Sequence, residues 1–90
     1  MFMKKTIMQT QESEFYKTAD LALVAVILLL IPDSLEVLDR TNQRKVLFVF
    51  KKTDELIGLV DKYWKRELMV EPQSFFNQLK IAKVRIYADN

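Results

Sequence analysis

The chain has no histidine and no cysteine among its 90 residues. Without these side chains it cannot form the common zinc sites, Cys-His or Ser-His nucleophiles, or disulfide bonds. It also has a single glycine, whereas the glycine-rich loops that hold nucleotide phosphates need several. Any catalysis would depend on carboxylates or lysines, so the composition favours a non-catalytic binding protein that uses no metal and no cofactor.

Long hydrophobic segments are also lacking. The longest unbroken apolar run, residues 21–31, has 11 members, whereas a helix that spans a membrane needs about 20. Lys4 and Lys5 are not followed by the apolar segment of a cleavable signal sequence. We therefore expect no membrane partner and a cytoplasmic location.

Apolar residues make up 50% of the chain, which is enough for one compact domain of this size but not for a multidomain enzyme. Residues 1–14 show no sustained periodicity, so we expect a flexible N-terminal arm with a short strand near residues 2–8. Residues 15–90 are expected to form a single α+β domain in the order helix, β-hairpin, helix, helix. The net charge of +2 is too small to identify a polyanionic ligand by itself.

The first helix and the hairpin are predicted from their boundary residues. Thr18 as the cap and Asp20 in the first turn mark the start of the helix, and Pro32 ends it. Residues 34–39 and 44–51 are predicted strands on either side of a polar turn. The second strand is apolar on both faces, which indicates that both of its faces are covered.

Two further helices are predicted after the hairpin. Thr53 caps one that begins at Asp54, and its apolar side is formed by Leu56, Ile57, Leu59, Val60, Tyr63 and Trp64. Pro72 begins the last helix, which runs to about Tyr87. Its main apolar stripe is predicted to be Phe75, Phe76, Leu79, Ala82, Ile86 and Tyr87.

Four short motifs carry a family resemblance: Phe15-Tyr16-x-Thr18-x-Asp20-Leu21-x-Leu23, Phe48-Val49-Phe50, Tyr63-Trp64, and Val70-Glu71-Pro72-x-x-Phe75-Phe76-x-x-Leu79. With these motifs the chain resembles a family of small prokaryotic domains of unknown function, over residues 15–87. The resemblance implies the limits of the domain but no activity. The family often has a glycine-containing turn after the first helix, where this chain has Ile31-Pro32-Asp33.

Positive charge is concentrated in residues 40–52, which contain no acid. The cations there are Arg40, Arg44, Lys45, Lys51 and Lys52. Together with Phe48 and Phe50 they resemble the combination of phosphate-binding cations and stacking rings found in sheet-type binders of single strands. The alternative is that the lysines protect an exposed strand edge while the phenylalanines fill the core.

A second group of cations, Lys62, Lys65 and Arg66, lies near Gly58 on the predicted solvent side of the middle helix. A glycine inside a helix costs about 1 kcal/mol relative to alanine, so this one calls for a reason. It would let a phosphate backbone or a partner helix approach closely. The alternatives are a tolerated glycine and ordinary surface pairing of Asp61 with Lys65.

The acids form no convincing metal or catalytic site. Asp20 is best explained by capping, because no second carboxylate lies at a suitable helical spacing. Along a strand, Glu36 faces the side opposite to Asp33 and Asp39, so this trio is predicted to be a solvated edge.

Apolar surface is in excess for a chain of this size. The helix at 21–31 is apolar all round, and the last helix has a second apolar stripe of Ile81, Val84 and Ala88. We expect this stripe to be a homodimer interface or a docking face for a larger protein; alternatively, the arm with Phe2, Met3, Ile7 and Met8 covers the surplus. The leading function is nucleic-acid binding by the basic hairpin and helix face, and the runner-up is a protein-interaction or scaffolding subunit.

Overall fold

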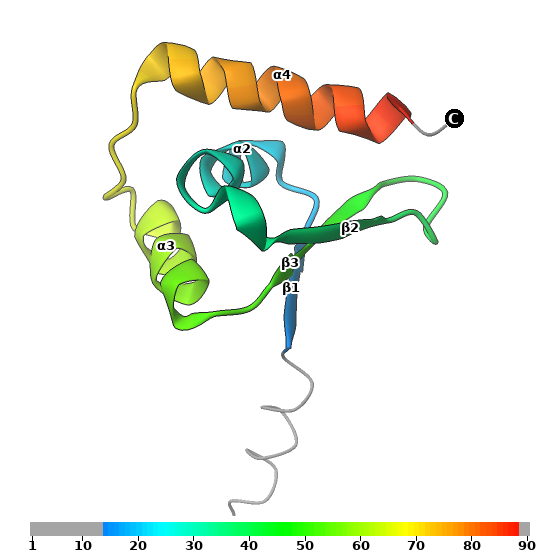
Figure 1. The fold of residues 1–90 in the computed structure, drawn as a ribbon, viewed down its shortest axis with the longest axis horizontal. Coiled ribbons are helices and arrows are strands. Elements are labelled where there is room, and N and C mark those ends of the chain that lie inside the picture. The colour runs from blue at the N-terminus through cyan, green and yellow to red at the C-terminus, as the bar shows by residue number, and fades with distance from the viewer. Residues whose placement is uncertain (1–13, 89–90) are drawn as a thin grey trace, which may run out of the picture.

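The computed structural model describes residues 14–88, so residues 1–13 of the predicted arm, with its short strand, lie outside the described residues. The predicted α+β class and the order helix, hairpin, helix, helix are confirmed, with one additional strand at the start (Figure 1). The elements are β1 (Phe15–Thr18), α2 (Leu21–Leu30), the 3-10 turn η1 (Pro32–Ser34), β2 (Leu35–Asp39), β3 (Leu47–Lys51), α3 (Asp54–Trp64) and α4 (Pro72–Ala88).

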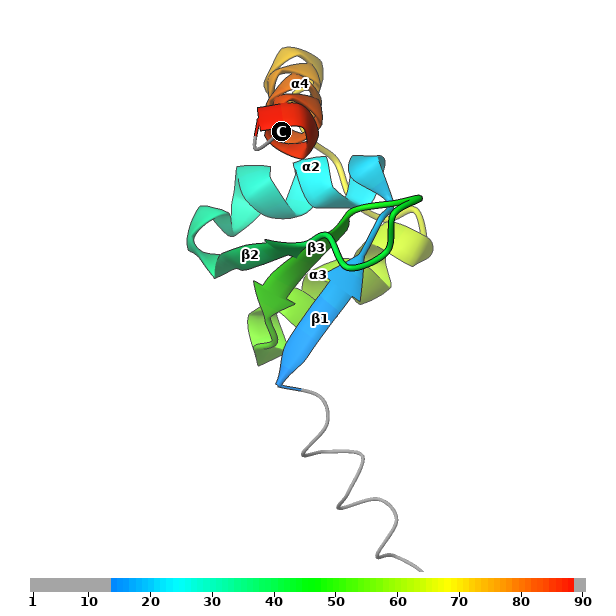
Figure 2. The ribbon, with the colours of Figure 1, turned by 90° about the vertical axis from the view of Figure 1, so that its right-hand side faces the viewer.

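The all-apolar helix α2 lies between the sheet and α4, as Figures 1 and 2 both show. Residues 23–28 of α2 are all buried, and they pack with Phe48 and Phe50 of β3 and Leu56 of α3. A helix that is apolar on every side must be covered on every side. Here the domain's own sheet and helices provide that cover, so α2 by itself does not require a partner molecule.

Asp20, and not Thr18, is the N-cap of α2. Its Oδ1 accepts hydrogen bonds from the backbone N–H groups of Ala22 at 3.1 Å and Leu23 at 3.2 Å. The Thr18 hydroxyl oxygen instead accepts from the Asp20 N–H at 3.0 Å. The capping role predicted for Asp20 is therefore confirmed, whereas the prediction that Thr18 caps the helix is wrong, because the helix begins at Leu21, two residues later than a cap at Thr18 implies.

The sheet has three antiparallel strands in the order β1-β3-β2. The sequence pattern did not predict β1. This strand pairs with the edge of β3 opposite to the one that pairs with β2, and Tyr16 lies opposite Phe50. The backbone N–H of Lys52 also donates to the Glu14 carbonyl oxygen at 3.0 Å, so the pairing includes Glu14. As the central strand, β3 buries Phe48 and Phe50 on one face and Val49 on the other, which confirms its two apolar faces.

The helix α3 begins at its predicted cap, because the Thr53 hydroxyl oxygen accepts from the Leu56 N–H at 3.1 Å. Its inner face is narrower than predicted: Leu56, Leu59 and Val60 are buried, whereas Ile57 and Trp64 are exposed. Tyr63 is half-buried, and its hydroxyl group donates to the Asp20 carboxylate at 3.3 Å. Burial and the nearby Asp20 charge raise the pKa of Tyr63.

The last helix, α4, packs on α2 along one face. Glu71 precedes Pro72 and caps the helix, with its carboxylate accepting from the N–H groups of Gln73 at 3.0 Å and Ser74 at 2.7 Å. Of the predicted main stripe, Ala82 is buried and Phe75, Leu79 and Ile86 are partly buried. Phe76 and Tyr87 were wrongly placed in that stripe, because their side chains are 57% and 69% exposed.

Within residues 14–88, no helix is both long enough and apolar enough to cross a lipid bilayer.

Candidate functional site

The loop between β2 and β3 is held by its own side chains. The Asp39 carboxylate accepts from the backbone N–H of Thr41 at 3.0 Å and from its hydroxyl group at 2.8 Å. These hydrogen bonds to Thr41, with the Lys17 ammonium 3.7 Å away, hold the pKa of Asp39 below its ordinary value. The Asn42 side-chain oxygen accepts from the Arg44 N–H at 2.7 Å. The loop therefore has a defined turn geometry that presents Arg44 at its tip.

Arg40 joins this loop to the end of α4. Its guanidinium donates to the carbonyl oxygens of Ile86 at 2.7 Å and Arg85 at 2.8 Å. The last carbonyl groups of a helix have no partner within the helix, and a cation there also complements the helix dipole. Arg40 was predicted to contact phosphates, but in the structure its guanidinium caps α4.

An open groove of about 590 Å³ lies between the loop and the C-terminal end of α4. Cations, side-chain amides and a tyrosine line it beside a few apolar side chains. The lining residues are Ala19, Leu21, Arg40, Asn42, Gln43, Arg44, Lys45, Val46, Ile86 and Tyr87. Because Arg40 bonds to α4, the cations that remain exposed in the loop are Arg44 and Lys45. The groove thus combines exposed positive charge with an exposed aromatic ring.

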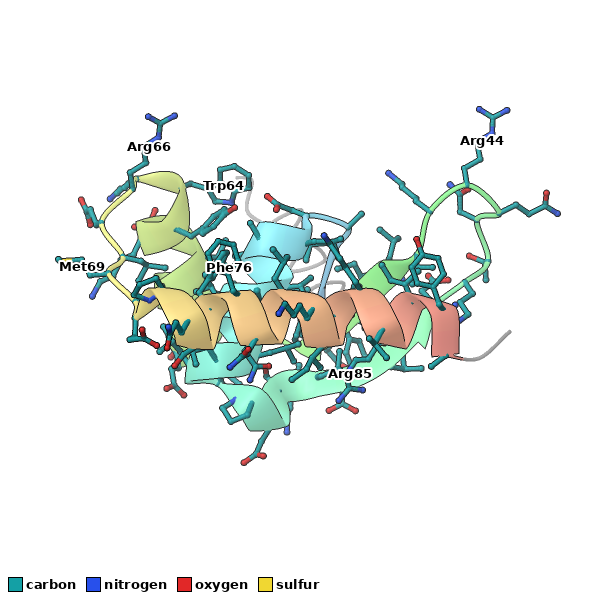
Figure 3. All side chains as sticks on the ribbon, turned by 90° about the horizontal axis from the view of Figure 1, so that it is seen from above. Arg44, Trp64, Arg66, Met69, Phe76 and Arg85 are labelled. Atoms are coloured by element: carbon teal, nitrogen blue, oxygen red, sulfur yellow. The ribbon has the colours of Figure 1, made fainter. Side chains whose placement is uncertain are left out.

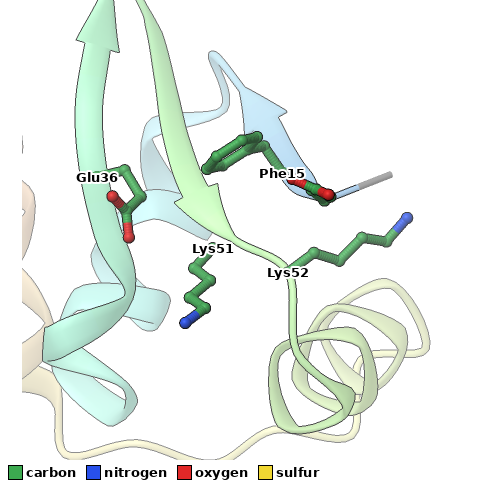
Figure 4. Close-up of a pocket in the computed structure, with 5 residues that line it drawn as sticks. Phe15, Glu36, Lys51 and Lys52 are labelled. Carbon is green, nitrogen blue, oxygen red and sulfur yellow. The ribbon is translucent and has the colours of Figure 1, made fainter. Parts of the chain in front are cut away.

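The structure divides the predicted cations into three groups. Arg40, Arg44 and Lys45 lie at the hairpin loop, and Lys51 and Lys52 lie at the opposite end of β3. Figure 4 shows the second group beside Phe15 and Glu36, around a depression of about 270 Å³. Lys62, Lys65 and Arg66 form the third group at the C-terminal end of α3, and Figure 3 shows Arg66 and Arg44 at opposite ends of the molecule. The eight cations therefore do not form one continuous patch.

The end of α3 has an unusual backbone. Arg66 has a φ of 62°, the left-handed conformation that glycine most often takes after a helix. The N–H of Arg66 donates to the Tyr63 carbonyl oxygen at 3.1 Å, and that of Glu67 donates to the Lys62 carbonyl oxygen at 3.0 Å. These two bonds complete a Schellman motif. Lys65 forms the predicted ion pair with Asp61, at 3.1 Å.

Gly58 faces open space on α3, since a Cβ built there would meet nothing within 4 Å. It lines a shallow groove of about 380 Å³ together with Leu30, Ile31, Lys62 and Leu68. No backbone or side chain of the described residues therefore requires a glycine at this position.

The second apolar stripe of α4 is exposed, as predicted. Val84 is 65% exposed, and Ile81 and Ala88 are also at the surface. Ala88 lines a depression of about 200 Å³ with Val37 and Leu38 of β2 and Arg85. Figure 3 shows Arg85, which lines this depression with Ala88, pointing to one flank of α4.

Some exposed groups were not singled out from the sequence. Tyr87 and Phe76 had been placed in the main apolar stripe of the last helix, and Lys80 and Lys83 had not been considered. The sequence did contain a sign of this exposed group, because the spacing of residues 76, 80, 83 and 87 places them on one side of a helix. Among residues 14–88, no group of three or more acids is close enough to hold a metal ion.

These observations define a small α+β domain whose most distinctive surface is the groove between a capped hairpin loop and its terminal helix. The chain belongs to the family described as a domain of unknown function (DUF5659), whose model matches residues 13–88. This membership confirms the resemblance noted in the sequence. Neither the curated proteins nor the solved structures contain a significant match.

Proposed function

We propose that this protein binds nucleic acid in the groove between the hairpin loop and the end of α4. The observation that carries the proposal is the groove itself, where Arg44 and Lys45 flank the exposed ring of Tyr87. Cations bind phosphates, and an aromatic face stacks on a base of any sequence. Asn42 and Gln43 add donors and acceptors at the same rim. Because phosphate contacts and stacking do not read sequence, the expected binding has little sequence preference.

The described surface near the groove is electrostatically suited to a polyanion. The loop at residues 40–46 and the helix α4 contain no acid, and Arg44 and Lys45 line the groove beside Arg40. The helix dipole would place partial negative charge at the end of α4, but Arg40 already offsets it there. An approaching phosphate therefore meets net positive charge. The proposal also implies a location in the cytoplasm, where nucleic acid is present. The family resemblance noted in the sequence adds the expectation of a prokaryotic cell.

The test is a fluorescence-anisotropy titration of labelled DNA and RNA oligonucleotides at low and moderate salt. We expect Arg44→Glu combined with Lys45→Glu to weaken binding by about 100-fold, and the wild-type affinity to fall steeply as salt rises. The matched control is Lys51→Glu with Lys52→Glu, which makes the same charge change at the other end of β3. If the Arg44/Lys45 variant binds like the wild type, or if binding does not depend on salt, the proposal is wrong.

A second candidate is self-association through the exposed apolar stripe of α4. It is favoured by one observation: Ile81, Val84 and Ala88 lie at the surface, and Ala88 lines a depression together with the exposed Val37. Apolar surface of this kind is the usual core of a homodimer interface. The mass in solution by analytical ultracentrifugation should be that of a dimer, and Val84→Asp should convert it to a monomer. A wild-type monomer at high concentration would exclude this candidate.

A further inference from the structure

Four side chains form a line along one flank of α4, in the order aromatic, cation, cation, aromatic: Phe76, Lys80, Lys83 and Tyr87. Their spacings of four, three and four residues keep them within one narrow sector of the helix surface. All four are exposed. This flank lies outside the buried face that contains Ala82, and its two lysines and the ring of Tyr87 are at the surface. The ring of Phe76 is exposed on one side and packs edge-on against Phe75, with 5.8 Å between the ring centroids.

The end of α3 extends this line beyond Phe76. Figure 3 shows Trp64 and Phe76 toward the same flank of α4, with Arg85 pointing to the opposite flank. Trp64 is 62% exposed, and its ring packs edge-on against Tyr63 with 5.0 Å between the ring centroids. Tyr63 is hydrogen-bonded to Asp20, so the ring against which the indole packs is held in place. The rest of the indole ring is exposed to solvent. Arg66 follows it at the end of the molecule.

From this arrangement we propose that the ligand is single-stranded nucleic acid, and that it runs from the hairpin groove along this flank of α4 to Trp64 and Arg66. This inference rests on the function proposed above and adds the type of strand and its path. Aromatic rings bind single strands because the faces of unpaired bases are free to stack, whereas a duplex hides them. Two lysines between the outer rings provide the phosphate contacts that such a path needs.

The dimensions and the charge fit this ligand. Phe76 and Tyr87 are eleven residues apart, which is about 16 Å along a helix axis. At roughly 3.4 Å per nucleotide of a stacked strand, this length corresponds to about five nucleotides, and fewer if the strand is extended. The helix α4 carries Lys80, Lys83 and Arg85 and no acid. A second copy of α4 would place like charges against each other, so the charge favours a polyanion on this flank.

Trp64 provides a direct test because it is the only tryptophan in the chain. The full-length protein would be titrated with oligothymidylates of about 3 and about 12 nucleotides, and with a duplex of the longer length. We expect the long single strand to quench Trp64 emission, because a base stacks on the indole ring. The short strand should bind without full quenching, and the duplex should bind more weakly and leave the emission unchanged.

Two charge reversals on α4 form a matched pair for the same titration. Lys83→Glu changes the proposed path, and we expect it to weaken binding of the long strand by about tenfold. Arg85→Glu makes the same change on the opposite flank and should have little effect. Circular dichroism of both variants checks that α4 is retained.

The outcomes separate this inference from the function on which it rests. If the long strand binds through Arg44 and Lys45 but leaves Trp64 emission unchanged, or if Lys83→Glu and Arg85→Glu behave alike, the path along α4 is wrong. If duplex and single strand bind equally, the preference for a single strand is wrong. If no oligonucleotide binds at all, the proposed function fails together with the inference.

Discussion

At the scale of single residues, Asp20 contacts three parts of the chain. Its carboxylate caps α2 and receives a hydrogen bond from Tyr63 of α3, and its backbone N–H donates to the Thr18 hydroxyl oxygen at the end of β1. A carboxylate at a helix N-terminus satisfies free N–H groups and also complements the positive end of the helix dipole. The position of the core helix relative to α3 and the sheet therefore depends on this side chain.

Replacing Asp20 tests this role. Asp20→Ala removes the cap and should lower the free energy of unfolding by about 1–2 kcal/mol. Asp20→Asn keeps an oxygen that accepts from the same N–H groups and should cost less. Urea unfolding followed by circular dichroism measures both variants. Equal stability of the alanine variant and the wild type would contradict the capping role.

Replacing Gly58 is predicted to increase stability, in contrast to replacing Asp20. A Cβ at this position meets nothing within 4 Å, so Gly58→Ala should raise the free energy of unfolding by about 1 kcal/mol. The gain arises because glycine loses more backbone freedom than alanine when the helix forms. Thermal unfolding measures the change. A lower melting temperature would mean that α3 needs the glycine for a reason that the described residues do not show.

At the scale of secondary-structure elements, α4 is packed along one face and capped at both ends. One face packs on α2, Glu71 caps its first turn, and Arg40 holds its last carbonyl groups. Because Arg40 comes from the loop that lines the groove, the loop and α4 are fixed relative to each other. The proposed groove therefore depends on this single guanidinium for its shape.

Loss of this contact should loosen the end of α4. Arg40→Ala leaves the carbonyl oxygens of Arg85 and Ile86 without their donor, and we expect a loss of about 1–3 kcal/mol. Arg40→Lys keeps the charge but cannot reproduce both bonds in the same planar geometry, so it should be intermediate. Amide hydrogen exchange should become faster in residues 84–88 of the alanine variant. Unchanged exchange there would show that Arg40 does not hold the helix end.

The cap at the other end of α4 makes its contribution dependent on pH. Hydrogen bonds from the Gln73 and Ser74 N–H groups and from the Ser74 hydroxyl group hold the pKa of Glu71 below its ordinary value of 4.5. A group with a lowered pKa in the folded state stabilises the fold at higher pH, and this contribution is lost as the pH falls below 4.5 through the lowered pKa. The stability difference between wild type and Glu71→Gln should therefore shrink on acidification. A difference that stays constant from neutral to acidic pH would contradict this role.

The comparison of sequence and structure at this scale shows where local patterns suffice. The caps at Asp20 and Thr53, the stop at Pro32 and the two-faced strand β3 follow from short-range chemistry, and the structure confirms them. The strand β1 was missed because its four residues form an element only by pairing with β3, 30 to 36 residues away. Phe76 was misassigned because α4 has two adjacent apolar sectors, and only contact with α2 decides which one is buried.

At the scale of the whole molecule, the apolar surplus anticipated from the sequence is partly resolved within the domain. The sheet and α4 cover α2, but Phe15, Val37, Trp64, Met69, Phe76, Val84 and Tyr87 are exposed in the described part of the chain. Four of these are aromatic and lie near cations: Phe15 is beside Lys51 and Lys52, and Trp64, Phe76 and Tyr87 lie at the end of α3 and along α4. Val84 instead belongs to the second, apolar stripe of α4. The two flanks of α4 therefore suit different ligands. The cationic site could be predicted only in part, because folding separates cations that are neighbours in the sequence.

The central claim is that nucleic acid binds to one flank of α4 and the adjoining hairpin loop. Chemical-shift mapping of the ¹⁵N-labelled full-length chain with a single-stranded oligothymidylate tests it most directly, because every surface is observed in one experiment. The account predicts that the shifted signals come from residues 42–46, from Lys83 and Tyr87, and from the indole N–H of Trp64. Shifts confined to the flank of Ile81 and Val84, or the absence of any shift at low salt, would contradict it.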